Sequence, residues 1–279
     1  MTEYADREQG AGAGRRIASD ELKSSPPGII DRIQQDLAKP AGEGGFVVSS
    51  ATVVMTADDT PIRTILTGRR VIVTGFYSSR KAGRALPFEG MNEQTLMKHS
   101  EVDTRVVDYR SQPFRFEFVI DGAKRIYIAD CARLLDDGAV EIVEVKGERT
   151  RLDDPDYAMK IEGVREICEK LGWRFRLVTR QQLHNPGTLF ANIESVQFHR
   201  NVSFDQADVY SAAELVDGEG GEAELGAVAD RLAGGPRGMA IAQALMVARV
   251  ISIDLTAPLS ANSRVTLVPP MAGPGRAFQ

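Results

Sequence analysis

Two carboxylates and a lysine lie within one short stretch of the sequence, residues 125–146, RIYIADCARLLDDGAVEIVEVK. Side chains two positions apart on a strand share a face, so Glu144 and Lys146 project together, roughly 7 Å apart along the strand. The turn at residues 136–138, Asp-Asp-Gly, suits a three-residue hairpin loop with glycine in the left-handed position. The pairing that follows from this turn places Asp130 directly opposite Glu144 on the same face.

An aspartate, a glutamate and a lysine on one sheet face are the smallest set of residues that metal-dependent hydrolysis of a phosphodiester requires. Carboxylate oxygens bind Mg²⁺, and an ammonium group orients the attacking water or neutralises charge that develops on the phosphate. The alternative interpretation is a solvated hairpin face with a cross-strand charge cluster, because Glu-x-Lys is common on strands. The hairpin alone does not decide between these two interpretations.

Composition excludes several other classes of protein. The 279 residues are 43% hydrophobic and 26% charged, which fits a soluble protein with one large or two modest domains. The sequence shows no apolar run of membrane-spanning length and no apolar signal core at its N-terminus, so we expect a cytoplasmic, reducing setting. Cys131 and Cys168 give no disulfide framework or zinc spacing, and the histidines are scattered. A G-x-x-x-x-G-K-[ST] loop is missing, so the chain is not expected to hydrolyse nucleotides itself.

Charge is unevenly distributed along a chain whose net charge is −5. Residues 61–84 contain no acid, and such a basic segment can contact DNA phosphates whatever the net charge, although it could also be merely solvated. Its basic residues are Arg63, Arg69, Arg70, Arg80, Lys81 and Arg84. Residues 205–233 are acidic, with Arg231 as their only basic residue, and are expected to face a protein partner. The acids are Asp205, Asp208, Glu214, Asp217, Glu219, Glu222, Glu224 and Asp230.

The residue patterns divide the chain into a flexible N-terminal arm (1–45), a central domain (46–185) and a C-terminal domain (186–279). The arm has one short helical pattern, at residues 29–37. Helices are predicted at 89–101 and 156–171, and strands at 46–55, 69–77, 114–120, 125–135, 140–146 and 173–179. Helices on the faces of such a mixed sheet define an α/β core, in which 114–146 form an antiparallel meander.

The C-terminal domain begins near His184-Asn185-Pro186-Gly187, where the composition changes. Helical patterns cover residues 205–216, 222–232 and 237–250, and a hairpin follows at 251–255 and 264–268. Three helices and a terminal hairpin indicate a winged-helix-like module. Such modules often bind DNA, but the acidic surface favours docking of a protein partner.

The sequence resembles TnsA, the endonuclease subunit of heteromeric Tns-type transposases, in two runs, SSRKAGRALPFEGMNEQTLMKHSEVDTRVVDYRSQP and RIYIADCARLLDDGAVEIVEVKG. The order and spacing of an E-x-x-x-E helix, a Gln-Pro pair, a Tyr-x-x-Asp motif and Glu-Val-Lys agree. The run VARVISIDLTAPLSANSRV is similar to the C-terminal winged-helix region of the family. The resemblance covers about residues 60–268.

The resemblance implies a restriction-endonuclease-like (PD-(D/E)xK) nuclease core. It places metal ligands at Glu93, Asp130 and Glu144, with the carbonyl of Val145 as a further ligand, and makes Lys146 the catalytic lysine. Glu89, one helical turn before Glu93, could share its role. The sequence departs from the family at Ala129, where a proline is usual.

The expected function is therefore that of a Mg²⁺-dependent endonuclease, with Mn²⁺ as a substitute, that cuts duplex DNA at transposon ends. It would cleave the non-transferred strand (the 5′ ends), beside a DDE-type transposase and a regulatory ATPase, without any membrane partner. One alternative is a stand-alone restriction or repair nuclease, which would need its own reader of DNA sequence. A second is a non-catalytic adaptor between transposase and ATPase, which the full set of ligands disfavours.

Overall fold

The computed structural model describes residues 28–39, 48–57, 60–63, 72–147 and 154–271, so most of the expected N-terminal arm lies outside the described residues. The helices are α1 Ile29–Leu37, α2 Met91–Val102, α3 Pro155–Lys170, α4 Arg180–His184, α5 Gly187–Phe198, α6 Gln206–Gly218, α7 Leu225–Leu232 and α8 Gly235–Val247. The strands are β1 Val48–Met55, β2 Thr74–Ser79, β3 Arg84–Glu89, β4 Val106–Ser111, β5 Phe114–Ile120, β6 Ala123–Ile128, β7 Cys131–Leu135, β8 Val140–Lys146, β9 Arg174–Thr179, β10 Glu222–Glu224, β11 Ile251–Ile253 and β12 Arg264–Leu267.

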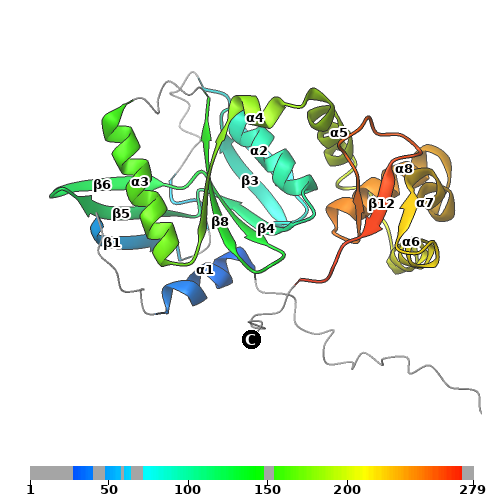
Figure 1. The fold of residues 1–279 in the computed structure, drawn as a ribbon, viewed down its shortest axis with the longest axis horizontal. Helices are drawn as coiled ribbons and strands as arrows, with labels where there is room; N and C mark the ends of the chain where they lie inside the picture. Colours follow the sequence, from blue (N-terminus) through cyan, green and yellow to red (C-terminus); the bar gives the residue numbers. More distant parts are fainter. Residues whose placement is uncertain (1–27, 40–47, 58–59, 64–71, 148–153, 272–279) are drawn as a thin grey trace, which may run out of the picture.

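A two-stranded ribbon that bends in the middle organises the N-terminal half (Figure 1). β4 pairs with β7, with Ser111 opposite Cys131, and β5, which follows β4, pairs with β6, which precedes β7. The two halves of the ribbon belong to different sheets, β1-β5-β6 and β4-β7-β8-β9. The single strand predicted over residues 125–135 is therefore divided at residues 129–130. The predicted meander is correct in its pairing but wrong in placing all three strands in one sheet.

The turns explain why the predicted register holds. Asp121 and Gly122 have φ of 49° and 75°, the pair of positive values that a two-residue hairpin turn requires. Gly138 has a φ of 79° in the second turn. Cys131 lies opposite Val143, so the predicted pairing of β7 with β8 is confirmed.

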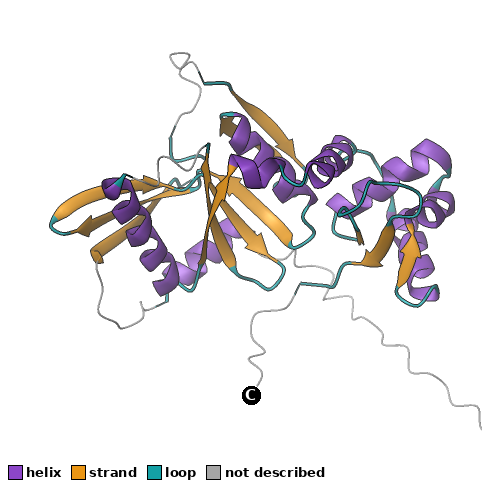
Figure 2. Ribbon diagram, turned by 45° about the horizontal axis from the view of Figure 1, so that its top comes forward, coloured by secondary structure: helices purple, strands orange, loops and turns teal. Residues whose placement is uncertain are grey.

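Helices cover both faces of the four-stranded sheet (Figure 2). Successive side chains of β7 point to opposite faces. Ala132 and Leu134 pack in the core that also contains Ile161 and Val164 of α3. Cys131 packs on the other face, in the cluster that includes α2.

Helix α1 corrects the prediction of a flexible arm for its residues. Ile29 and Ile33 are fully buried in the same core as α3. The backbone N–H of Ile29 donates to Asp108 Oδ2 at 2.9 Å, and Trp173 Nε1 donates to Asp36 Oδ2 at 3.0 Å. The amphipathic pattern at residues 29–37 therefore marks a core helix rather than an isolated turn in an arm.

The C-terminal half has the element order α6-β10-α7-α8-β11-β12 and a hydrophobic core of its own. The three predicted helical stretches correspond to α6, α7 and α8, and the predicted hairpin to β11 and β12. Residues 222–224, expected to be helical, instead pair with β12 as β10, so the small sheet has three strands in the order β10-β12-β11.

Helix α5, which was not predicted, joins the two halves. Its residues Ile193 and Val196 lie in the core of the C-terminal half, and so does Val102 at the end of α2. Lys98 of α2 pairs with Glu194 of α5 at 2.7 Å.

The described residues thus form a mixed α/β fold consistent with a restriction-endonuclease-like architecture. Among the described helices, none combines the length and apolarity that crossing a membrane requires.

Replacing Gly238 tests the close packing of α8 on α7. A Cβ atom at this position would lie 2.1 Å from the Ala229 carbonyl oxygen, so Gly238→Ala should lower the free energy of unfolding by about 1–3 kcal/mol. Gly218→Ala is the control, since a Cβ atom there meets nothing within 4 Å. Denaturant unfolding measures both variants, and equal stability of the two would contradict the packing.

Candidate active site

Asp130 lies at the bend of the ribbon, between β6 and β7. Its backbone carbonyl accepts a hydrogen bond from Gln112 N at 3.0 Å, and Ala129 N donates to Phe114 O at 3.4 Å. The Asp130 carboxylate accepts a hydrogen bond from Val145 N of β8 at 2.9 Å. The bend therefore releases Asp130 from strand pairing and holds its side chain beside β8.

The negative charges of Asp130, Glu93 and Glu144 repel one another near this bend. Removal from solvent, and then the charges of Glu144 and Glu93, raise the pKa of Asp130 well above its usual range. Removal from solvent also raises the pKa of Glu93 to about 7. The N–H of Glu89 opposes that rise, as does the charge of Arg63, whereas the charges of Glu89 and Glu144 add to it. The structure thus brings the predicted carboxylates Glu93, Asp130 and Glu144 within electrostatic range of one another.

Glu144 is buried, and both of its carboxylate oxygens accept hydrogen bonds. Tyr127 donates its hydroxyl to Oε2 at 2.6 Å, and Tyr157 donates to Oε1 at 3.0 Å. Lys146 Nζ lies 2.6 Å from the same Oε1 and 4.6 Å from the centre of the Tyr157 ring. Glu144 and Lys146 therefore share a face of the strand, as the strand periodicity predicted, and their side chains form an ion pair.

Glu89 does not occupy the helical position that the sequence predicted. It is the last residue of β3, and α2 begins only at Met91. The backbone N–H of Glu89 donates to Glu93 Oε2 at 2.9 Å. Glu89 therefore lies next to Glu93 through the strand-to-helix turn and not through a shared helix face.

A cleft of about 510 Å³ opens beside Glu93. Glu89, Glu93 and Val145 contribute to its wall, and its basic lining side chains are Lys98, Arg180 and His184. These residues were not predicted, because they come from α2 and α4, which the basic segment does not include. The cleft therefore places three basic side chains beside the carboxylates of Glu89 and Glu93.

The donor set fits a divalent cation in its chemistry, although among the described residues no group of three His, Cys, Asp or Glu side chains is arranged to hold a metal ion. Asp130 and Glu93 supply oxygen ligands whose mutual repulsion a cation would relieve. Both oxygens of Glu144 are already occupied by hydroxyl and ammonium donors. Asp130 and Glu93 are therefore better placed than Glu144 to bind a cation.

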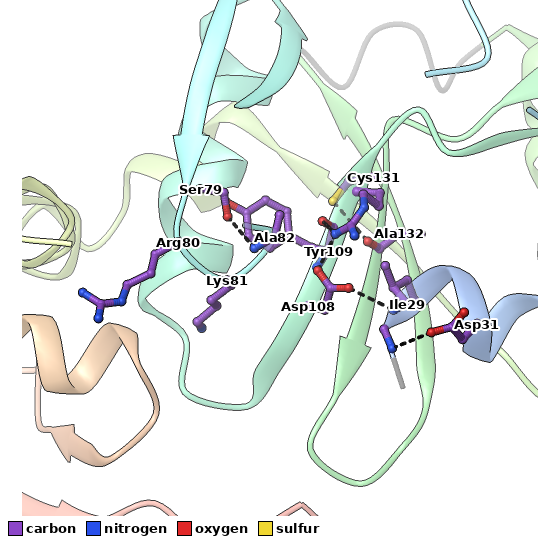
Figure 3. Close-up of polar contacts among 12 residues, drawn as sticks. Ile29, Asp31, Ser79, Arg80, Lys81, Ala82, Asp108, Tyr109, Cys131 and Ala132 are labelled. Carbon is purple, nitrogen blue, oxygen red and sulfur yellow. Dashed lines mark hydrogen bonds and ion pairs between the residues drawn. The ribbon is translucent and has the colours of Figure 1, made fainter. Parts of the chain in front are cut away.

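Two residues of the predicted DNA-binding segment, Arg80 and Lys81, lie in the turn between β2 and β3 (Figure 3) and make intramolecular contacts. Arg80 extends toward the C-terminal half, where its Nη1 donates to the carbonyls of Arg200 and Val202, both at 3.1 Å. Lys81 Nζ donates to the carbonyls of Ser100 and Asp103 at 3.0 and 2.6 Å. Removal from solvent lowers the pKa of Lys81 to about 7. Arg80 Nη1 and Lys81 Nζ therefore donate to backbone carbonyls of the same chain instead of pointing into solvent.

The turn that carries these residues is fixed to α2 by a buried carboxylate. Glu101 accepts hydrogen bonds from the hydroxyls of Ser79 and Tyr109, each at 2.7 Å, and from Arg80 N at 2.7 Å. Ala82 N donates to Ser79 Oγ at 3.0 Å within the turn (Figure 3). The SSRKAG run therefore forms a turn in which Glu101 binds the Ser79 hydroxyl and the Arg80 N–H.

The other members of the basic segment are distributed differently. Arg69 and Arg70 lie outside the described residues. Arg63 Nη2 pairs with Glu89 Oε2 at 2.5 Å, whereas Arg84 is exposed at the start of β3.

Sequence reasoning assigned no role to three residues that line or support the site. Tyr127 and Tyr157 hold Glu144, and Gln112 holds the backbone of Asp130. The signals for Tyr127 and Gln112 were the Tyr-x-x-Asp and Gln-Pro motifs, whose spacing was visible but whose partners lie on other elements. Tyr157 belongs to neither motif.

Comparisons with known proteins cover only part of the chain. The family described as TnsA-like endonuclease N terminal matches residues 103–180, which include Asp130, Glu144 and Lys146 but not Glu93. A crystal structure of protein VC1899 from Vibrio cholerae is similar at 16% identity, covering 38% of this chain and a third (33%) of that chain. Its TM-score of 0.23 is too low to support an argument. No curated protein matches the sequence significantly.

The raised pKa of Glu93 predicts how stability depends on pH. Its carboxyl group has a pKa of about 7 when folded against 4.5 ordinarily, so the folded chain holds a proton that the unfolded chain releases. Stability in the presence of a chelator should therefore fall as pH rises from about 4.5 through about 7. Glu93→Gln should flatten this fall in thermal unfolding, and parallel curves for the two proteins would contradict it.

Proposed function

Because residues 103–180 carry the N-terminal endonuclease domain of TnsA-like proteins, a nuclease domain related to transposase subunits, we propose that this chain is the metal-dependent endonuclease subunit of a transposase. Its substrate is duplex DNA at transposon ends, where it cuts the non-transferred strand at the 5′ ends. The observation that carries the proposal is the group of mutually repelling carboxylates Asp130, Glu93 and Glu144 beside Lys146. Such perturbed carboxylates mark functional sites.

The residues present define the roles of the site. Asp130 and Glu93 would hold Mg²⁺, for which Mn²⁺ is a substitute. The Val145 carbonyl would be a further ligand, and so would Glu144 through lone pairs that its tyrosine and lysine donors leave free. A divalent cation supplies charge stabilisation at the phosphate when it is bound. Lys146, positioned by Glu144 and the Tyr157 ring, donates hydrogen bonds to the phosphate or to the attacking water. The water loses a proton as its oxygen forms a new bond to phosphorus, the bond between phosphorus and one deoxyribose oxygen breaks, and that leaving oxygen takes up a proton.

The C-terminal half is proposed as a winged-helix-like docking module for the DDE-type transposase and a regulatory ATPase. The order helix, strand, helix, helix, strand, strand supports this assignment. Asp217, Glu219 and Glu224 are exposed, so the surface is acidic and suits a basic protein surface better than DNA. A stand-alone nuclease would need a DNA reader here instead, and a non-catalytic adaptor would not need the complete carboxylate–lysine set.

Substitution of Asp130 tests the catalytic proposal. Asp130→Asn removes a charged oxygen ligand at almost constant volume, so DNA cleavage should fall at least about 100-fold while the fold is retained. Nicking of plasmid DNA with transposon ends, with the transposase added, measures cleavage. A chelator should abolish the wild-type activity, and Mg²⁺ or Mn²⁺ should restore it.

The matched control is Asp137→Asn in the turn of the same hairpin, where the exposed carboxylate pairs with Arg174 at 2.6 Å. This variant should cleave at the wild-type rate. Unchanged cleavage by folded Asp130→Asn, or cleavage that persists in the chelator, would contradict the proposed mechanism.

Charge reversal tests the docking surface. Asp217→Lys combined with Glu224→Lys should weaken binding to the transposase subunit about tenfold or more, because complementary charge governs encounter and register. Glu162→Lys, on the exposed side of α3, is the control and should bind normally. Fluorescence titration at two salt concentrations measures both. If the double variant instead gains affinity for duplex DNA and binds the transposase unchanged, the stand-alone nuclease is the better interpretation.

A further inference from the structure

Gln112 occupies an unusual position for a non-glycine residue. Its side chain is fully buried, and its backbone has a φ of 45°, in the left-handed region that favours glycine. Pro113 follows it and further restricts its backbone. Such a conformation persists only where the surroundings fix it, and residues of this kind concentrate at functional sites.

Those surroundings are the active-site bend and the segment that contains Arg63. Gln112 N donates to the carbonyl of Asp130 at 3.0 Å, and Gln112 O accepts from Ile62 N at 2.9 Å. Gln112 Oε1 accepts from Arg63 Nε at 3.0 Å. Because a guanidinium only donates, this bond assigns the orientation of the amide. The remaining amide nitrogen, Nε2, is a buried donor with no acceptor among the described residues.

Arg63 continues the chain of hydrogen bonds to the second carboxylate. Its Nη2 donates to Glu89 Oε2 at 2.5 Å, and the Glu89 side chain is only 6% exposed. The N–H of Glu89 donates to Glu93 Oε2 at 2.9 Å. A continuous path therefore runs from the backbone of Asp130 to the carboxylate of Glu93.

We propose that Arg63 and Gln112 are positioning residues, which together hold the Glu93 carboxylate and the Asp130 backbone in fixed relation across the site. This role rests on the proposed nuclease function and differs from the DNA contact that the basic segment predicts for Arg63. The planar guanidinium spans two acceptors that point in different directions, Gln112 Oε1 and Glu89 Oε2. A lysine ammonium keeps the positive charge but lacks the planar set of N–H groups that lets a guanidinium donate to both acceptors.

The experiment compares Arg63→Met and Arg63→Lys in the full-length chain. Arg165→Met is the control, because Arg165 also pairs with a glutamate but lies on α3 with 53% of its side chain exposed. Three quantities are measured: Mn²⁺ affinity by calorimetry, kcat and KM for cleavage, and affinity for duplex DNA in a chelator over a range of salt. Thermal unfolding verifies that each variant is folded.

Both Arg63 variants should weaken Mn²⁺ binding and lower kcat by about 10–100-fold, the range seen when groups that orient metal ligands are removed. KM and metal-free DNA affinity should stay within about twofold of wild type, and the control should match wild type throughout. If Arg63→Met does not fold, Arg63→Lys decides alone. Gln112→Met should give the same defect, and combining it with Arg63→Lys should add little, because both act through one path.

Two results would overturn the positioning role. Wild-type Mn²⁺ affinity and kcat in Arg63→Lys would show that charge alone matters. Weaker metal-free DNA binding with a smaller salt slope, at unchanged Mn²⁺ affinity, would make Arg63 a phosphate contact. Failure of the wild-type chain to bind Mn²⁺, or to cut DNA with the transposase added, would instead contradict the proposed function itself.

Discussion

The N-terminal half depends on one constraint, which is that both strands of its central ribbon bend at the same level. Gln112 and Pro113 bend one strand, residues 129–130 bend the other, and the hydrogen bond from Gln112 N to Asp130 O joins the two bends. Without the bend, β5 and β6 would continue the four-stranded sheet, and Asp130 would be an ordinary paired strand residue. With it, the Asp130 carboxylate can accept from Val145 on β8. The geometry of the site is therefore a consequence of where the ribbon changes sheets.

This geometry is electrostatically unfavourable in the chain by itself. Glu144 is stabilised by two tyrosine hydroxyls and Lys146, but Asp130 and Glu93 retain raised pKa values because burial and neighbouring charge outweigh their hydrogen bonds. A site selected only for stability would replace such groups with apolar residues of similar volume. Local violations of this kind are expected where function requires them.

Features that depend on residues close together in the sequence could be predicted from it, and features that depend on distant residues could not. Alternating side chains and turn glycines are local signals, so most helices, the strands from β5 to β9 and the register that sets Cys131 opposite Val143 could be predicted. Strands β3 and β4 were not predicted. The bend at residues 129–130 could not be predicted, because sheet membership depends on β1 and β9, which are distant in sequence. Glu89 was assigned to a helix because a strand-to-helix turn one residue long leaves little local trace. Contacts of Arg80 depend on residues 200–204, beyond any local pattern.

Helix α2 connects the two halves in a way that bears on control of the site. Its first turn carries Glu93, whereas Val102 in its last turn packs in the core of the C-terminal half. Lys98, midway between them, pairs with Glu194 of α5. A partner that displaces the C-terminal half must therefore either move α2 or break its contacts, and a helix of twelve residues transmits displacement better than a loop. Because the path from Asp130 through Gln112 and Arg63 ends on the same glutamate, movement of α2 would change the separation of the two carboxylates. If a partner docks on the C-terminal half as proposed, its docking and the separation of the Asp130 and Glu93 carboxylates are linked through helix α2.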